Sequence, residues 1–209
     1  MKWTLYIKGC LLCGVLIVAT ECEAQHFVGV REGVSMSSVQ FNPSRDDTST
    51  FQTLNVGVVY KYYSRKWVGF QSGLTYAEKG YKLGDTTFRY SVLEFPFLTQ
   101  FHMEIWKFRL IAHGGLYASY FLELNKHYHI AEGKEEEKKF DFDGRDNRFE
   151  YGMHFGGGLA LMFDPFEIQF EANYQYGLSY LKKPTYESKS IMFTHFTQMI
   201  FSAAVLFKL

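Results

Sequence analysis

Strict alternation of apolar and polar residues is the feature that most constrains this sequence. Between Phe166 and Ser179 (FEIQFEANYQYGLS) one parity is apolar or aromatic at every position. The other parity carries glutamates, glutamines, an asparagine, a glycine and a serine. Side chains alternate between the two faces of a β-strand, whereas a helix would scatter them around its circumference. The segment therefore predicts a strand with one apolar and one polar face.

The same period recurs along the chain and predicts eight strands. The segment from Phe149 to Phe163 has the same two faces and is separated from the next strand only by Asp164-Pro165. The other six predicted strands are approximately Phe27–Gln40, Leu54–Tyr63, Trp67–Lys79, Tyr90–Glu104, Phe108–Glu123 and Thr194–Leu209. Strands of this length exceed the globular norm of about five or six residues and suit a tilted bilayer crossing of about 9–11 residues.

The predicted connections alternate in length. Short turns are expected near Ser64-Arg65-Lys66, Trp106-Lys107 and Asp164-Pro165, and long loops at Phe41–Thr53, Gly80–Arg89, Asn125–Arg148 and Lys182–Phe193. The charge run Glu132–Lys139 (EGKEEEKK) in the third long loop is predicted to be solvated and mobile. Short turns on one rim and long loops on the other are typical of outer-membrane barrels. The pattern therefore predicts an all-β fold, an eight-stranded antiparallel up-and-down transmembrane β-barrel with both termini at the short-turn rim.

Alternation alone does not distinguish a membrane barrel from a soluble barrel with an apolar interior. The apolar parity is rich in bulky side chains, in a chain that contains 21 Phe and 15 Tyr. The interior of an eight-stranded barrel is only just wide enough for side chains to fill it, so this face would overfill it. The polar parity also carries many of the glycines, which suit a crowded interior. We therefore expect the polar face to point inward and the apolar face to contact lipid.

Residues 1–24 are predicted to form a cleaved export signal, which leaves residues 25–209 as one barrel domain. Lys2 and Lys8 begin the segment, an apolar run from Gly9 to Thr20 follows, and Ala24 provides a small residue at the cleavage point. The three cysteines of the chain all precede that point: Cys10, Cys13 and Cys22. The mature barrel would therefore have neither disulfides nor thiol chemistry.

The polar parity of the predicted strands defines the candidate site, a polar network in the barrel lumen. Its members are Arg31, Lys61, Gln71, Lys79, Glu94, Gln100, Glu104, Arg109, His113, Glu150, His154, Glu167, Gln169, Glu171 and Gln175. Both signs of charge are present within a narrow interior, and buried charges must pair. We therefore expect a salt-bridged plug instead of a water-filled channel.

Three weaker patterns raise other chemistries. His127 and His129 form an H-x-H pair that could bind a metal with Glu132 as a third ligand. His113 and His154, with Glu150, could form a histidine–carboxylate base. Scattered acids could contact calcium, but the closing bidentate glutamate is missing; they are Asp85, Asp141, Asp143 and Asp146. Ordinary loop polarity and interior packing are the preferred interpretations, so the sequence predicts no catalytic residue, no metal and no cofactor.

Several segments resemble a known family. They are Val30–Ser35 (VREGVS), Gly69–Tyr76 (GFQSGLTY) with Lys79-Gly80, Leu93–Pro96 (LEFP), Gly156–Gly158 and Tyr174–Leu178 (YQYGL). On these residues the chain resembles the outer-membrane β-barrel domain family that includes PorT, of the Bacteroidota type. The resemblance implies an outer-membrane barrel, and PorT itself serves protein secretion. One departure is Arg31-Glu32-Gly33, where Lys-Gly-Gly is commoner.

Three function classes remain open. The first is a structural, accessory or binding protein of the outer membrane, with a secretion-related role as one form of it. The second is a porin-like channel or carrier for a small solute, and the third is a membrane-embedded hydrolase or acyltransferase at the loop-side rim. The expected partners are outer-membrane lipid and other envelope or secretion-machinery proteins. Nucleic acid is not expected, because 22 basic residues balance 22 acidic ones.

Overall fold

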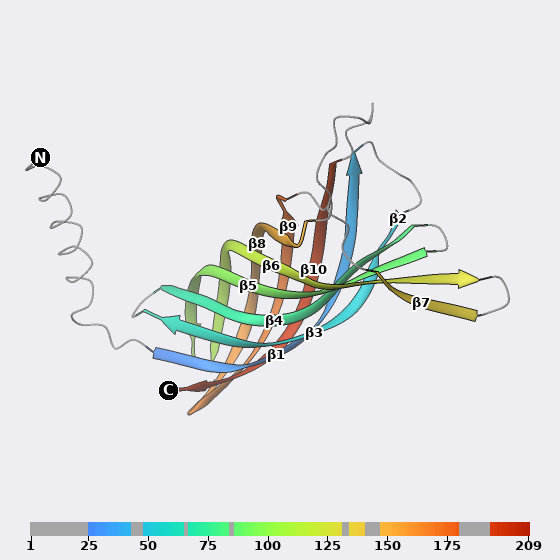
Figure 1. The fold of residues 1–209 in the computed structure, drawn as a ribbon. Coiled ribbons are helices and arrows are strands. Elements are labelled where there is room, and N and C mark those ends of the chain that lie inside the picture. Colours follow the sequence, from blue (N-terminus) through green and yellow to red (C-terminus); the bar gives the residue numbers. More distant parts are fainter. Residues whose placement is uncertain are drawn as a thin grey trace, which may run out of the picture.

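A computed structural model gives the fold of this chain (Figure 1). It describes residues 25–42, 48–64, 67–83, 86–130, 134–140, 147–179 and 193–209. The predicted signal, residues 1–24 with its three cysteines, lies outside them and stays a prediction. Within the described residues, no helix is long and apolar enough to cross a membrane.

The described chain consists of strands. In chain order they are β1 (Gln25–Asn42), β2 (Thr48–Ser49), β3 (Phe51–Tyr63), β4 (Val68–Leu83), β5 (Thr86–Ile105), β6 (Phe108–Ile130), β7 (Lys134–Phe140), β8 (Phe149–Phe163), β9 (Phe166–Gly177) and β10 (Phe193–Lys208). Eight of these form the barrel wall, and the two short ones, β2 and β7, extend its sheet through pairings with β4 and β6.

The eight wall strands close on themselves. Their order is β4-β3-β1-β10-β9-β8-β6-β5, every neighbouring pair is antiparallel, and β4 pairs with β5 to complete the ring. The first and last wall strands in the sequence, β1 and β10, lie side by side, with Phe27 opposite Lys208. The predicted eight-stranded antiparallel barrel is confirmed, and closure leaves no wall strand with an unpaired edge.

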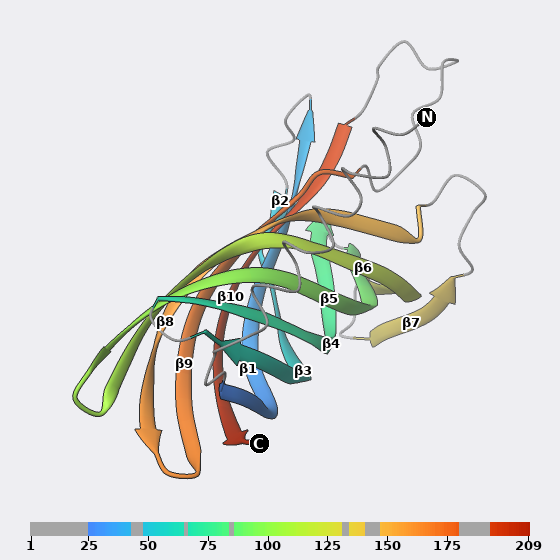
Figure 2. The ribbon, with the colours of Figure 1, turned by 90° about the vertical axis from the view of Figure 1, so that its left-hand side faces the viewer.

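The short connections gather at one end, together with the described ends of the chain. The backbone amide of Lys208 donates to the carbonyl of Pro165, and that of Leu209 donates to the carbonyl of His26. The amide of Met162 donates to the carbonyl of Lys107, which joins two of the short turns. Figure 2 shows β8 and β9 joined by their turn at the same end as the C-terminus. We call this the short-turn end, and the opposite end the loop end.

The loop end differs from the prediction. The prediction of a ten-residue loop over Gly80–Arg89 is wrong, because β4 continues to Leu83 and β5 begins at Thr86. The charge run was expected to be mobile, but Lys134–Phe140 forms β7 and pairs with β6 as far as Ile130 opposite Lys134. Wall strands that are already paired provide a template on which adjoining residues of any polarity can continue the backbone hydrogen bonds.

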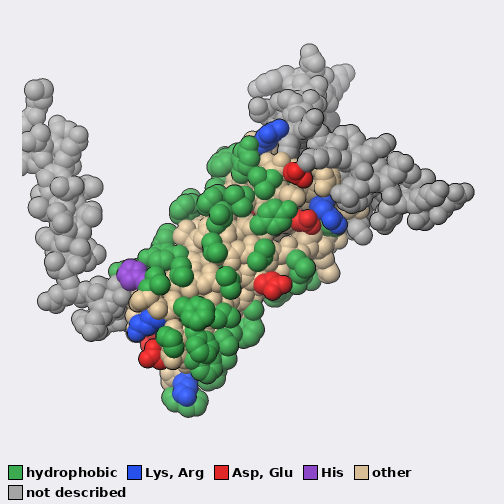
Figure 3. Space-filling model, turned by 60° about the horizontal axis from the view of Figure 1, so that its bottom comes forward, with side chains coloured by type: hydrophobic (Ala, Val, Ile, Leu, Met, Phe, Trp, Pro, Cys, Tyr) green, Lys and Arg blue, Asp and Glu red, His purple; other side chains and the backbone are tan. Residues whose placement is uncertain are grey.

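The outward face of the wall is apolar. Its exposed aromatic residues include Phe97, Phe101, Phe155, Phe170 and Phe201. Figure 3 shows hydrophobic side chains spread over the wall, with few charged ones among them. A soluble protein could not leave so large an apolar surface in water, but it suits contact with lipid.

The inward face is polar in the middle and apolar toward each end. One apolar layer lies near the short-turn end and contains Phe27, Val59, Tyr63, Ala204 and Leu206. The other lies toward the loop end and contains Val39, Ala77, Tyr81, Tyr90, Val92, Phe121, Leu124 and Phe196. The polar residues between these layers form the candidate site.

Candidate functional site

The structure places the predicted lumen residues on the inward face of the wall strands. Fourteen of the fifteen have buried side chains. The exception is Glu104, whose side chain is 49% exposed at the short-turn end of β5. Glu123, which the alternation assigned to the lumen parity of its strand, is exposed. The parity changes there because the β5–β6 register shifts between Ser91 and Val92, which removes one residue of β6 from the alternation.

The first group of charges surrounds Arg109, just inside the short-turn end. The guanidinium pairs with Glu167, and Nη2 lies 2.7 Å from Glu104 Oε1. Its Cζ lies 4.0 Å from the centroid of the Tyr63 ring, and the Tyr63 hydroxyl donates to Glu167 Oε1 at 3.0 Å. Tyr63, a member of the apolar layer at this end, therefore also holds the arginine in place, through a cation–π contact and a shared carboxylate.

The second group surrounds Glu171 on β9. Lys61 Nζ donates to Glu171 Oε1 at 3.0 Å and also to the amide oxygen of Gln169. Arg31 approaches the other carboxylate oxygen, with Nη1 3.6 Å from Glu171 Oε2, and donates from Nη2 to Thr75 Oγ1 at 2.7 Å. One carboxylate thus lies between two cations that come from β1 and β3.

The third group surrounds Lys79 on β4, deeper toward the loop end. Its Nζ lies 2.7 Å from Glu94 Oε1 and 2.9 Å from Glu150 Oε2. The Tyr117 hydroxyl donates to Glu150 Oε1 at 2.8 Å, and the lysine Nζ lies 4.9 Å from the centroid of the Tyr117 ring. Gln175 Nε2 donates to the remaining oxygen of Glu94 at 3.3 Å.

The buried charges balance. Among the described residues the interior holds four cations, Arg31, Lys61, Lys79 and Arg109, and four carboxylates, Glu94, Glu150, Glu167 and Glu171. Each of the eight has an opposite charge within 4 Å. Pairing of this kind is required, because an isolated charge in a low-dielectric interior is very costly. Together with the apolar layers toward both ends, these ion pairs occupy the inward face of the described wall.

The histidines do not pair with Glu150, which was the less favoured interpretation of the sequence. His113 Nε2 lies 2.6 Å from Asn173 Oδ1, and His154 Nδ1 lies 3.2 Å from Gln175 Nε2. The hydrogen bonds of Glu150 go to Lys79 and Tyr117 instead. The suggested histidine–Glu150 dyad is therefore wrong.

Gly156 leaves the space that this arrangement needs. A Cβ atom there would lie 2.0 Å from Asn173 Oδ1 and 2.7 Å from His113 Nε2. A larger residue would therefore displace the hydrogen-bonded pair of side chains.

Some inward polar groups have no protein partner. Both amide atoms of Asn55, Gln71 and Gln198 are buried and lack a hydrogen bond within the described structure. Gln71 is one of the predicted lumen residues, whereas Asn55 was not singled out. Tyr63, Tyr117 and Asn173 were not among the predicted site residues, although the alternation places all three on the inward face. A tyrosine on the inward face can donate a hydrogen bond to a buried carboxylate, which the pattern of charges alone does not reveal.

The suggested metal sites receive no support from the described residues. No group of three or more histidine, cysteine, aspartate or glutamate side chains that could hold a metal ion occurs in the part of the chain that the structure describes. His127 and His129 lie in β6, opposite Glu137 and Glu135 in the backbone register. Glu132 and the four suggested calcium ligands, Asp85, Asp141, Asp143 and Asp146, lie outside the described residues.

Comparison with known proteins gives the same architecture. The sequence model of the family described as "Outer membrane protein beta-barrel domain" matches residues 24–183. No curated protein matches the sequence significantly.

Two solved structures are similar to this chain at low sequence identity. Neisserial surface protein A (NspA) is 11% identical, with a TM-score of 0.51 over 88% of this chain and 97% of its own. The outer membrane protein OprG from Pseudomonas aeruginosa is 12% identical, with a TM-score of 0.49 over 88% of this chain and 96% of its own. The likeness to NspA shows the fold, and the low identities carry no residue roles across.

Proposed function

The chain belongs to the family of outer membrane protein beta-barrel domains, and we propose that it serves the bacterial outer membrane as a non-conducting accessory or binding protein. Its family places it in that membrane. Support for the proposal comes from the interior, where Lys79, Glu94 and Glu150 form one of three ion-paired groups between two apolar layers. A barrel whose interior holds ion pairs and apolar side chains in place of a water-filled path is expected to act through its surfaces.

The loop end offers one such surface. The pairing of β6 with β8 ends at Tyr120, but β5 and β6 remain paired beyond that residue. The short strand β7 pairs with β6 in this extension. A paired sheet holds its residues in a fixed arrangement outside the wall, which favours recognition of another macromolecule over diffusion of a solute. The proposed partners are other envelope proteins, and the outward apolar face contacts outer-membrane lipid. A role beside a protein-secretion machinery, suggested by the resemblance to PorT, is the narrower form of this proposal.

A small-solute channel is the competing function. The observation in its favour is the set of buried amides without protein partners, at Asn55, Gln71 and Gln198, since polar groups of that kind line solute paths. The apolar layers at the two ends of the interior weigh against it. An enzymatic role has no comparable observation in its favour, because the candidate histidines and Glu150 are engaged in separate hydrogen bonds.

Crosslinking in intact outer membranes tests the accessory role. A variant with residues 129–140 replaced by a two-residue turn removes β7 and keeps the β6–β8 pairing, which ends at Tyr120. We expect the full chain to give a discrete crosslinked adduct with another envelope protein and the shortened chain to lose it, while heat-modifiable gel mobility shows that both are folded. Absence of any protein adduct, together with solute flux into proteoliposomes, would replace this proposal with the channel.

A further inference from the structure

The carboxylate of Glu32 lies on the outward face of the wall. Glu32 is exposed, and it alternates with the exposed residues Val30 and Val34 along β1. Across the sheet it lies opposite Val56 on β3 and Ala203 on β10. None of the described residues forms a hydrogen bond or ion pair with it.

Its place along the strand is the middle of the apolar band. Between Val28 and Met36 the outward residues of β1 are apolar except for Glu32, which lies at the centre of that run. Toward the short-turn end the outward face becomes polar at His26, whose Nδ1 lies 2.8 Å from the Tyr60 hydroxyl. Glu32 therefore faces the hydrocarbon region of the bilayer, where an ionisable side chain without a partner is unfavourable and marks a functional position.

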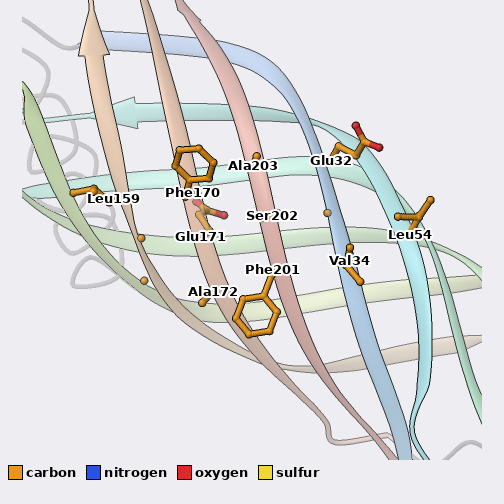
Figure 4. Close-up of a pocket in the computed structure, with 13 residues that line it drawn as sticks. Glu32, Val34, Leu54, Leu159, Phe170, Glu171, Ala172, Phe201, Ser202 and Ala203 are labelled. Atoms are coloured by element: carbon orange, nitrogen blue, oxygen red, sulfur yellow. The ribbon is translucent and has the colours of Figure 1, made fainter.

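A hollow in the outer wall adjoins this carboxylate. Its volume is about 750 Å³, and Glu32 lies along its border (Figure 4). Small outward residues, Gly157, Ala172 and Ala203, line it, and the larger side chains of Leu159, Phe170 and Phe201 stand around them. Small residues allow another chain to approach the backbone closely, as at helix contacts within membranes.

Lipid could fill the hollow but would leave the carboxylate unpaired. Acyl chains carry no hydrogen-bond donor, and cationic headgroups lie at the membrane surface. The described residues of a second copy of this chain do not supply a cation at that depth either. Its lysine and arginine residues that are at least partly exposed among those described lie at turns and strand ends or beyond the wall, namely Arg89, Lys107, Arg148 and Lys208.

We propose that the Glu32 hollow is a docking surface for a membrane-spanning segment of a different protein, which brings a basic side chain to the carboxylate. The apolar hollow provides the packing, and the carboxylate selects a segment with a lysine or arginine at mid-membrane depth. Such a pair is far stronger inside a bilayer than in water, because the dielectric constant is low. The inference goes beyond the proposed accessory role and does not depend on the loop-end surface.

Photocrosslinking from inside the hollow tests this proposal in the full chain. A photoreactive phenylalanine analogue replaces Ala203, and the matched control carries it at Phe97, an exposed outward position on β5. We expect position 203 to give one heavier adduct whose crosslinked peptide lies in a membrane-spanning segment with a lysine or arginine. Glu32→Val should reduce that adduct at least tenfold, Glu32→Asp should retain part of it, and position 97 should not give it.

The variants also report on the isolated barrel. Purified Glu32→Val in lipid vesicles should unfold at a higher urea concentration than the natural chain, because an unpaired carboxyl leaves the lipid face. An adduct of twice the mass of this chain, lipid adducts alone, or a protein adduct that Glu32→Val leaves unchanged would each overturn the proposal. Removal of the basic residue from the crosslinked segment should abolish the adduct, and its persistence would also overturn it.

Discussion

Glu171 and Glu32 lie on opposite faces of the same wall and meet opposite surroundings. Glu171 faces inward, between Lys61 and Arg31, and its side chain is 2% exposed. Glu32 faces outward among valines, and no described group pairs with it. Their strands are both neighbours of β10, where Ser202 lies opposite Glu171 and Ala203 lies opposite Glu32. Ser202 and Ala203 are adjacent on β10 and face opposite sides of the wall. The carboxylate opposite Ser202 is therefore paired in the interior, and the carboxylate opposite Ala203 is unpaired in lipid.

The comparison separates two kinds of stabilisation in one sheet. The inner face depends on complementary charges, so its residues act in groups and the removal of one member leaves its partners buried without compensation. The outer face depends on the absence of polar atoms, so its residues act individually and according to depth. Variants on the two faces should therefore respond differently to the same kind of substitution.

The largest effect is expected on the inner face, at Lys79. Lys79→Met leaves Glu94 and Glu150 buried near each other without their shared cation. The free energy of unfolding should fall by about 3–5 kcal/mol, as it does when one partner of a buried ion pair is removed. Urea titration in lipid vesicles, followed by tryptophan fluorescence, measures the change.

The control neutralises the whole group. Lys79→Met combined with Glu94→Gln and Glu150→Gln should recover most of the lost stability, because no uncompensated charge remains. If the triple variant were less stable than the single one, the interior would not act as a set of paired charges.

The next effect is expected on the outer face, at Phe170. In the Glu32→Val background, where no outward carboxylate borders the hollow, Phe170→Arg places an unpaired cation in the middle of the apolar band, opposite Ala203. It should cost about 2–4 kcal/mol of unfolding free energy, whereas Phe207→Arg near the short-turn end should cost about 0–1 kcal/mol. The same vesicle titration compares them, and equal losses at the two positions would contradict the proposed depth of the membrane.

The smallest effect compares two tyrosines on the two faces of β3. Tyr63 faces inward and donates to Glu167 at 3.0 Å, while Tyr60 faces outward and lies 2.8 Å from His26. Tyr63→Phe should lower the free energy of unfolding by about 1.5–3 kcal/mol, since its acceptor is a buried charge. Tyr60→Phe should lower it by only about 0.5–1.5 kcal/mol. A larger loss at Tyr60 than at Tyr63 would reverse the assignment of the faces.

Alternation predicted the wall because barrel geometry imposes it residue by residue. Strands such as Phe149–Phe163 were predicted with the bounds that the structure gives, since both ends carry recognisable turn residues or a change of period. The loop end was predicted poorly. Gly80–Arg89 has no clear alternation, and its pairing depends on the neighbouring strands, which local sequence does not reveal.

Parity placed the lumen charges but could not pair them. Lys61 and Glu171 are 110 residues apart in the sequence, and their contact depends on closure of the ring between β1 and β10. The roles of Tyr63 and Tyr117 were hidden for a different reason. Aromatic residues are abundant on the outward face, so an aromatic residue on the inward parity is not distinctive by its type.

An interior closed by ion pairs and apolar layers should not conduct ions, and single-channel recording tests this most directly. Purified, verified monomer is inserted into planar lipid bilayers at neutral pH, and the current is recorded under an applied voltage. The filled interior predicts insertion without steady conductance. A large, steady conductance from the monomer would contradict the closed interior and make a solute channel the better account of this protein.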